Sequence, residues 1–218
     1  MNIKGIFFDT SDTLYSSPEL EQKISDAPID FIMHMRGVTA EEASNILETG
    51  KEKATANGSL LTKSNILKEA GFENSDWQNF IAEIDTTKYL TPIKENIETL
   101  EYLSSKYRLG IITNINTKFL LNILNTLGLS KDLFSYLITS DDTPESKPHP
   151  APFLLAIEKA GALPEEIYYV GDNVKKDIAP AKKIGMKAIL VDYKNFHGDK
   201  SGEFDNRIKN IEELKSIF

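Results

Sequence analysis

The chain has 218 residues, which is enough for one ordinary domain or for a core domain that carries an insertion. Apolar residues make up 40% of the chain and charged residues 27%, so disordered and low-complexity classes of protein are excluded. Cysteine is absent, which excludes disulfide frameworks, cysteine-bound zinc, iron–sulfur clusters and thiol nucleophiles. Any metal site must therefore use oxygen or imidazole ligands.

The distribution of charged and apolar residues limits the possible partners. There are 25 Lys and Arg residues against 33 Asp and Glu residues, the net charge is −8, and the basic residues are scattered. We therefore expect no nucleic acid partner. No apolar run approaches the roughly 18 residues of a membrane helix, and the first apolar stretch stops at Asp9. We expect a cytoplasmic protein without a membrane partner, and the sequence carries no signal for its oligomeric state.

The first predicted element is a strand at residues 5–8, where the run Gly-Ile-Phe-Phe ends abruptly at Asp9. Such a short apolar run is typical of a strand that is buried on both faces. A strand of this kind belongs in the interior of a sheet.

The next stretch, residues 16–91, contains only helical patterns. Residues 39–42 form a capping box, Thr62 can cap a further helix, and apolar residues recur at helical spacing over residues 77–84. Pro28 is expected to break or kink the first helix of this stretch.

After residue 91 the pattern alternates between strands and helices. Apolar runs predict four further strands, at residues 108–113, 134–139, 167–171 and 187–191. Helical patterns between them begin near Pro92, Thr117 and Pro150. This alternation predicts an α/β fold with a parallel, doubly wound sheet. Residues 193–205 are polar and contain glycine, and we expect a surface loop there.

The position of the helical stretch predicts the domain organisation. A block inserted directly after the first strand lies at the carboxyl ends of the strands, where parallel sheets bind ligands. We therefore predict a Rossmann-like core domain, residues 1–15 and 92–218, and a small all-helical cap domain, residues 16–91, that is placed to cover a site.

Polar residues gather where the predicted strands end. They are Asp9 after the first strand, Thr113 and Asn114 after the second, Lys147 in a proline-flanked turn, and Asp172 and Asp177 after the fourth. Three converging carboxylates repel one another unless a cation lies between them, and an all-oxygen ligand set suits Mg²⁺. A hydroxyl and an ammonium beside a metal-bound carboxylate are what phosphoryl transfer needs, because negative charge spreads over the phosphoryl oxygens.

These residues lie in four segments, around Asp9, Thr113, Lys147 and Asp172. The order and spacing of the four segments resemble the motifs of the haloacid dehalogenase superfamily along the whole chain. The resemblance implies a Rossmann-like core with a helical cap inserted after the first strand. Within the superfamily, the segment around Asp9 and the length of the cap look most like the pyrimidine 5′-nucleotidase-type branch.

The resemblance also implies a role for each site residue. Asp9 matches the nucleophile, which forms an aspartyl-phosphate. Thr113 and Lys147 match the phosphate-binding hydroxyl and the charge-balancing lysine. Asp172 matches a metal ligand, and Asp177 matches a metal-site carboxylate or one just behind it.

One position departs from the phosphatases of this family. Two residues after the nucleophile they carry an Asp that protonates the leaving group and then activates water, whereas this chain has Ser11. The family uses only the backbone carbonyl of that residue as a metal ligand, so the metal site can survive the change. Asp12 lies at the next position and should project differently, so it does not obviously replace the missing acid.

Several interpretations of Ser11 remain open. The chain can be a slow or specialised phosphatase, or a non-catalytic or regulatory protein that binds a phosphorylated ligand. The dehalogenase branch needs no leaving-group proton, but it does not use Mg²⁺, so the pair Gly171-Asp172 argues against it. A P-type ATPase site has Thr at this position, but 218 residues with no apolar run long enough for a membrane span argue against a pump.

We therefore predict a Mg²⁺-dependent hydrolase whose partner is a small phosphorylated metabolite. The predicted metal ligands are Asp9, the Ser11 carbonyl, Asp172 and Asp177. The predicted substrate contacts are Thr113, Asn114, Lys147 and Tyr15.

Overall fold

The computed structural model describes residues 3–192 and 204–218. The surface loop predicted at residues 193–205 therefore lies almost wholly outside the described residues. The chain divides into two compact units. The core unit consists of Met1–Ser17 and Leu90–Phe218, and the helical unit is the single segment Pro18–Tyr89.

In its described residues the core unit contains a parallel sheet of six strands in the order β3-β2-β1-β4-β5-β6. The strands are β1 (Gly5–Phe8), β2 (Arg108–Ile112), β3 (Phe134–Ile138), β4 (Ile167–Gly171), β5 (Lys187–Val191) and β6 (Asn206–Ile208). This confirms the predicted α/β fold. The sixth strand was not predicted, because three residues that include Asn206 and Arg207 carry no apolar run.

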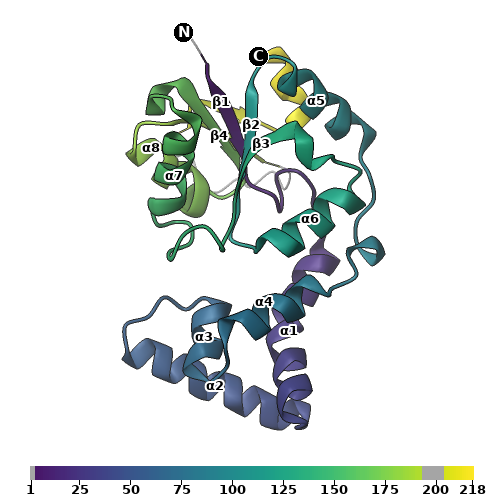
Figure 1. Ribbon diagram of the computed structural model, residues 1–218, viewed down its shortest axis with the longest axis vertical. Coiled ribbons are helices and arrows are strands. Elements are labelled where there is room, and N and C mark those ends of the chain that lie inside the picture. Colours follow the sequence, from purple (N-terminus) through teal and green to yellow (C-terminus); the bar gives the residue numbers. More distant parts are fainter. Residues whose placement is uncertain (1–2, 193–203) are drawn as a thin grey trace. The chain divides into compact units, whose positions relative to one another are not determined.

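The first strand of the sequence lies in the middle of the sheet. Residue Gly5 pairs with Arg108 of β2 on one side and with Ile167 of β4 on the other. All four residues of β1 are buried, as the unbroken apolar run predicts. The carboxyl ends of β2, β1 and β4 consequently lie side by side (Figure 1).

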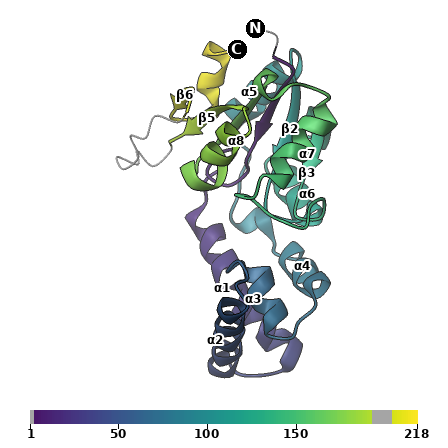
Figure 2. The ribbon, with the colours of Figure 1, turned by 90° about the vertical axis from the view of Figure 1, so that its left-hand side faces the viewer.

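Helices cover both faces of this sheet. They are α5 (Lys94–Ser104), α6 (Thr117–Thr126), α7 (Ala151–Ala160) and α8 (Ala179–Lys183), with η2 (Lys131–Leu133), η3 (Pro164–Glu166), η4 (Val174–Ile178) and η5 (Ile211–Ser216). Figures 1 and 2 show α7 and α8 on one face and α5 on the other. On the face that α7 and α8 cover, one buried apolar cluster includes Phe7, Phe153 and Tyr169. Helix α7 ends at Gly161, whose left-handed backbone (φ 57°) favours glycine.

The helical unit contains four helices and a short turn in its described residues. They are α1 (Pro18–Arg36), α2 (Ala40–Ala56), α3 (Lys63–Glu69), α4 (Asn74–Ala82) and η1 (Thr86–Lys88). The capping box is present, with Thr39 and Glu42 bonded reciprocally, and Thr62 caps α3. Phe31 of α1 packs against the rings of Trp77 and Phe80. Over the described residues of both units, no helix has the length and apolar character that crossing a bilayer requires.

Helix α1 continues through Pro28, so of the two expected effects the break is wrong, and the kink stays a prediction. A proline inside a helix removes one backbone hydrogen bond and costs about 3 kcal/mol. Pro28 is itself buried, and its neighbours Ala27 and Phe31 are buried with it. Burial of this apolar face offsets the cost of the lost bond.

Candidate active site

Three carboxylates come together at the carboxyl edge of the sheet. Asp9 follows β1, Asp172 follows β4, and Asp177 lies in the π-helical turn η4. One oxygen from each of the three carboxylates lies within 4.8 Å of the others. Asp177 is 1% exposed and the other two side chains are partly buried. The structure thus brings together the three acids that the sequence analysis placed at one edge.

The turn η4 aims Asp177 back at the end of β4. Asn173 caps this turn, because its side-chain oxygen accepts hydrogen bonds from the backbone N–H groups of Lys175 and Lys176. The Asn173 N–H donates to Asp177 Oδ2 at 3.2 Å. A Cβ atom at Gly171 would lie 2.7 Å from Asp177 Cβ, so the close approach of strand and turn requires glycine there.

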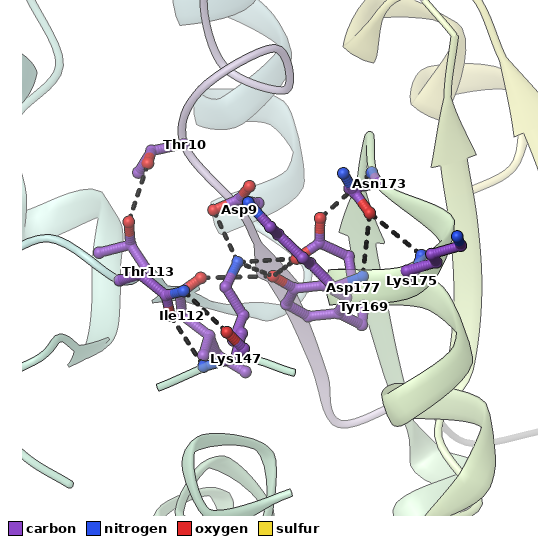
Figure 3. Close-up of polar contacts among 11 residues, drawn as sticks. Asp9, Thr10, Ile112, Thr113, Lys147, Tyr169, Asn173, Lys175 and Asp177 are labelled. Atoms are coloured by element: carbon purple, nitrogen blue, oxygen red, sulfur yellow. Dashed lines mark hydrogen bonds and ion pairs between the residues drawn. The ribbon is translucent and has the colours of Figure 1, made fainter. Parts of the chain in front are cut away.

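Lys147 lies at the centre of the polar network in Figure 3. Its Nζ atom is 2.8 Å from Asp9 Oδ1 and 2.7 Å from Asp177 Oδ1, and it donates to the Tyr169 hydroxyl at 2.8 Å. An ammonium has three N–H bonds, so these three acceptors use all of them. The side chain of Lys147 is only 3% exposed. It therefore joins the nucleophile candidate to the buried acid.

Asn114 fixes the backbone at Lys147. Its side-chain oxygen accepts a hydrogen bond from the Lys147 N–H at 2.9 Å, and its side-chain N–H₂ group donates to the Lys147 carbonyl at 2.9 Å. The sequence predicts that Asn114 contacts substrate, and this stays a prediction. In the structure the two polar atoms of its side chain hold the loop that carries Lys147.

Thr113 and Thr10 share a hydrogen bond between hydroxyl groups. Their Oγ1 atoms are 3.0 Å apart, and both residues are buried (Figure 3). Thr113 directly follows β2, and its N–H donates to the Ile138 carbonyl at 2.9 Å. Thr10 is a site residue that was not predicted. The only signal for it in the sequence was a hydroxyl directly after Asp9.

Tyr169 is the second residue that the sequence analysis missed, because it lies inside an apolar strand. Its hydroxyl lies 3.0 Å from Asp177 Oδ1 and 3.3 Å from the Ile112 carbonyl, and it accepts from Lys147. Residues two apart in a strand lie on the same face, so Tyr169 shares its face with Gly171. Asp177 packs against Gly171 on this face of β4. The available signal for Tyr169 was therefore a hydroxyl on the same strand face as Gly171.

The loop after Asp9 folds back on itself. Ser11 forms an isolated parallel bridge with Tyr15, and Asp12 has a left-handed backbone (φ 51°). Asp12 Oδ1 accepts a hydrogen bond from the Ser16 hydroxyl at 2.6 Å. Tyr15, a predicted substrate contact, is buried, with 4% of its surface exposed.

The charges of the site shift the pKa values of its residues. Burial raises the pKa of Asp9 to about 6, although the positive charge of Lys147 opposes the shift. Burial, together with the negative charges of Asp177 and Asp9, raises the pKa of Asp172 to about 7. Burial disfavours the charged form of Lys147, but the two carboxylates outweigh it and raise the pKa of the ammonium. Lys147 therefore stays protonated at neutral pH.

These features fit a divalent cation such as Mg²⁺. The ligand atoms are all oxygens, and the raised pKa values of Asp9 and Asp172 show carboxylates that a cation would stabilise in their ionised form. Asp177 is more deeply buried than these two acids, and both of its oxygens accept hydrogen bonds, Oδ1 from Lys147 and Oδ2 from Asn173.

Comparisons with known proteins match nearly the whole chain. The model of the haloacid dehalogenase-like hydrolase family matches residues 5–191. The chain is 33% identical to glyceraldehyde 3-phosphate phosphatase from Methanocaldococcus jannaschii over 226 residues, 99% of this chain and 96% of that protein. It is 30% identical to the protein of the same name from Methanothermobacter thermautotrophicus over 230 residues, 99% of each. A HAD phosphatase structure from Thermococcus onnurineus superimposes with a TM-score of 0.67 at 25% identity, covering 99% of this chain and 97% of that one.

Proposed function

Because the chain belongs to the haloacid dehalogenase-like hydrolases, as its sequence predicted, we propose that it is a Mg²⁺-dependent phosphatase that hydrolyses small phosphate monoesters. The observation that carries this proposal is the ion pair of Asp9 with the buried Lys147, beside Asp172 and Asp177. The likeness to two glyceraldehyde 3-phosphate phosphatases over almost the full chain supports it. Glyceraldehyde 3-phosphate is therefore the first physiological substrate to test.

In the first step an oxygen of Asp9 attacks the phosphorus atom. A bond forms between that oxygen and phosphorus, the bond to the ester oxygen breaks, and its electron pair leaves with the alcohol. The Lys147 ammonium lies 2.8 Å from Asp9 Oδ1 and favours the ionised carboxylate that this attack needs. The hydroxyl of Thr113 binds a phosphoryl oxygen, and the positive charge of the nearby Lys147 ammonium offsets the negative charge of the phosphoryl group.

The proposed metal ligands are the carboxylates of Asp9 and Asp172 and the backbone carbonyl of Ser11. Mg²⁺ bound there would neutralise part of the negative charge of the phosphoryl group. Asp177 acts through Lys147, to which it is hydrogen-bonded at 2.7 Å. It thereby keeps the ammonium charged and in place.

In the second step water attacks the aspartyl-phosphate, which releases phosphate and restores Asp9. Both steps involve a proton: the leaving alcohol gains one and the attacking water loses one. Ser11 is a poor proton donor and acceptor at neutral pH. We therefore propose that the enzyme favours substrates whose leaving group needs no proton, such as acyl phosphates or p-nitrophenyl phosphate, and that it loses its phosphoryl group slowly.

The helical unit is the proposed cap. It is inserted between β1 and α5, in the connection that begins with Asp9 at the carboxyl end of β1. A cap in this position selects the substrate and excludes water from the reaction.

The test is a phosphatase assay with p-nitrophenyl phosphate, glyceraldehyde 3-phosphate and a panel of phosphorylated metabolites, with Mg²⁺ and with EDTA. The control is Asp9→Asn, which keeps the shape of the side chain and removes the nucleophile. We expect Mg²⁺-dependent activity in the wild type and none in the variant. Equal residual rates in the two proteins would contradict the proposal and favour a non-catalytic protein that binds a phosphorylated ligand.

A further inference from the structure

The Tyr169 hydroxyl is the one uncharged acceptor of the Lys147 ammonium among the described residues. The other two acceptors, Asp9 and Asp177, are carboxylates that attract the ammonium from different sides. Figure 3 shows the hydroxyl beside Nζ and Asp177, at the end of a ring that comes from β4. The third N–H of Lys147 is therefore directed by Tyr169.

The position of the Tyr169 hydroxyl is fixed by its own hydrogen bonds and by the packing of its ring. The hydroxyl accepts a hydrogen bond from Lys147 and has a single proton to donate. Two acceptors are within reach of that proton, Asp177 Oδ1 at 3.0 Å and the Ile112 carbonyl at 3.3 Å. The ring is fully buried, and it packs in a T-shaped contact with Phe153, with the centroids 5.1 Å apart. The hydroxyl thus projects from a fixed ring and has little freedom to move.

Lys147 needs such a fixed contact because its own side chain is long and flexible. Asp177 is deeply buried, with 1% of its side chain exposed, whereas 14% of the Asp9 side chain is exposed. Without a third acceptor, the ammonium is free to shift between the two carboxylates along its four-carbon stem. A shift toward Asp177 would lengthen the contact with Asp9. The tyrosine hydroxyl opposes that shift.

We propose that Tyr169 is a positioning residue that holds the Lys147 ammonium against Asp9 during phosphoryl transfer. The proposal rests on the proposed phosphatase function. Tyr169 does not touch the reacting atoms; it acts through Lys147. The contact of Lys147 with Asp9 orients the nucleophile, and this orientation matters most in the transition state. Loss of the Tyr169 hydroxyl therefore lowers kcat more than it raises KM.

The test compares Tyr169→Phe with Tyr168→Phe. Each variant removes one tyrosine hydroxyl, and the two tyrosines are neighbours in β4. Tyr168 packs against Phe218, with ring centroids 5.0 Å apart, and takes no part in the site. For Tyr169→Phe we expect kcat to fall about ten- to a hundred-fold, the range for one lost hydrogen bond to a charged group. KM should change less than about threefold. For Tyr168→Phe we expect both constants to match the wild type.

A second measurement does not depend on turnover. In protein labelled with ¹⁵N-lysine, the buried Lys147 ammonium should give a signal that is protected from solvent exchange. This signal should shift or disappear in Tyr169→Phe and stay unchanged in Tyr168→Phe.

Several results would overturn the proposal. It fails if Tyr169→Phe has the same kcat as Tyr168→Phe, if only KM changes, or if the Lys147 signal is unaffected. It also fails if Tyr169→Phe does not fold by circular dichroism, because the hydroxyl would then serve the fold. In each of these cases an active wild type leaves the phosphatase function standing. A wild type no more active than Asp9→Asn would instead remove the function and this inference together.

Discussion

The side chain of Asn114 binds the backbone of Lys147 through two hydrogen bonds, both of 2.9 Å. The pair links the end of β2 to the loop that carries the ammonium. Removing the amide leaves a partly buried N–H and carbonyl without these partners, which costs about 1–3 kcal/mol. We expect Asn114→Ala to lower the free energy of unfolding by about that amount and to lower kcat, because Lys147 loses its support.

Urea unfolding and steady-state kinetics measure these two effects. The matched control is Asn125→Ala, since Asn125 is exposed on α6. An Asn114→Ala protein with unchanged stability and kcat, and a raised KM alone, would instead identify Asn114 as a substrate contact.

Ser11 should limit the release of phosphate from Asp9. We expect the wild type to give a burst of p-nitrophenol followed by a slow steady state. Ser11→Asp should raise steady-state turnover of alkyl phosphates about ten-fold or more, since a general acid/base contributes roughly 10²–10⁴. Rapid-quench kinetics with both classes of substrate measure this difference.

The control for this substitution is Ser11→Asn. The Asn side chain has nearly the same size as that of Asp, but it cannot act as a general acid or base. This variant should turn over no faster than the wild type. Fast wild-type hydrolysis of alkyl phosphates without a burst would show that another residue supplies the proton, and that the role assigned to this position is wrong.

Mg²⁺ should stabilise the folded protein. A ligand that binds only the native state adds about 2.7 kcal/mol at a concentration one hundred times its Kd. We expect the melting temperature to be higher in Mg²⁺ than in EDTA, and the difference to be largely lost in Asp172→Asn. Asp142→Asn should keep the difference, because Asp142 pairs with Lys159 outside the three-acid cluster. Identical melting curves, with no heat of Mg²⁺ binding, would contradict the metal site.

The stability of the metal-free protein should fall as pH rises from about 5 to 8. The pKa of Asp9 is about 6 and that of Asp172 about 7 in the folded protein, against the ordinary value of 3.8 for an Asp side chain. Between these values the native state binds more protons than the unfolded state, so raising the pH favours unfolding. Urea unfolding in EDTA at several pH values measures the slope.

The slope should become smaller in Asp172→Asn, and Mg²⁺ should reduce it in the wild type. In Asp142→Asn it should not change above pH 5. Hydrogen bonds from Thr139 outweigh the effect of burial and lower the pKa of Asp142, so this group stays ionised throughout that range. A stability that rises between pH 5 and 8 in EDTA would contradict the electrostatics described for the site.

Local sequence signals predicted most of the fold. Unbroken apolar runs located five strands, and the capping box located the start of α2. They failed where the deciding forces were not local. The strand β6 depends on pairing with β5, and Pro28 is accommodated because of what α1 buries.

For the candidate site, the chain order of strands was sufficient to place Asp9, Asp172 and Asp177 at one edge. It was not sufficient to show which polar groups meet there. Tyr169 and Lys147 are 22 residues apart, and their contact depends on the depth of a side chain in the sheet. Hydrophobic periodicity identifies the face of a strand but not the partner of a hydroxyl group.

The central place of β1 in the sheet has a consequence for how the protein reaches its native state. Both neighbours of β1 come much later in the chain, since Gly5 pairs with Arg108 and Ile167. The helical unit, Pro18–Tyr89, is continuous in sequence, so its contacts close shorter loops. During synthesis it leaves the ribosome before either neighbour of β1 exists, and we expect it to fold first. Asp9 is thus made well before Lys147, and its carboxylate is positioned only after the later strands have joined β1.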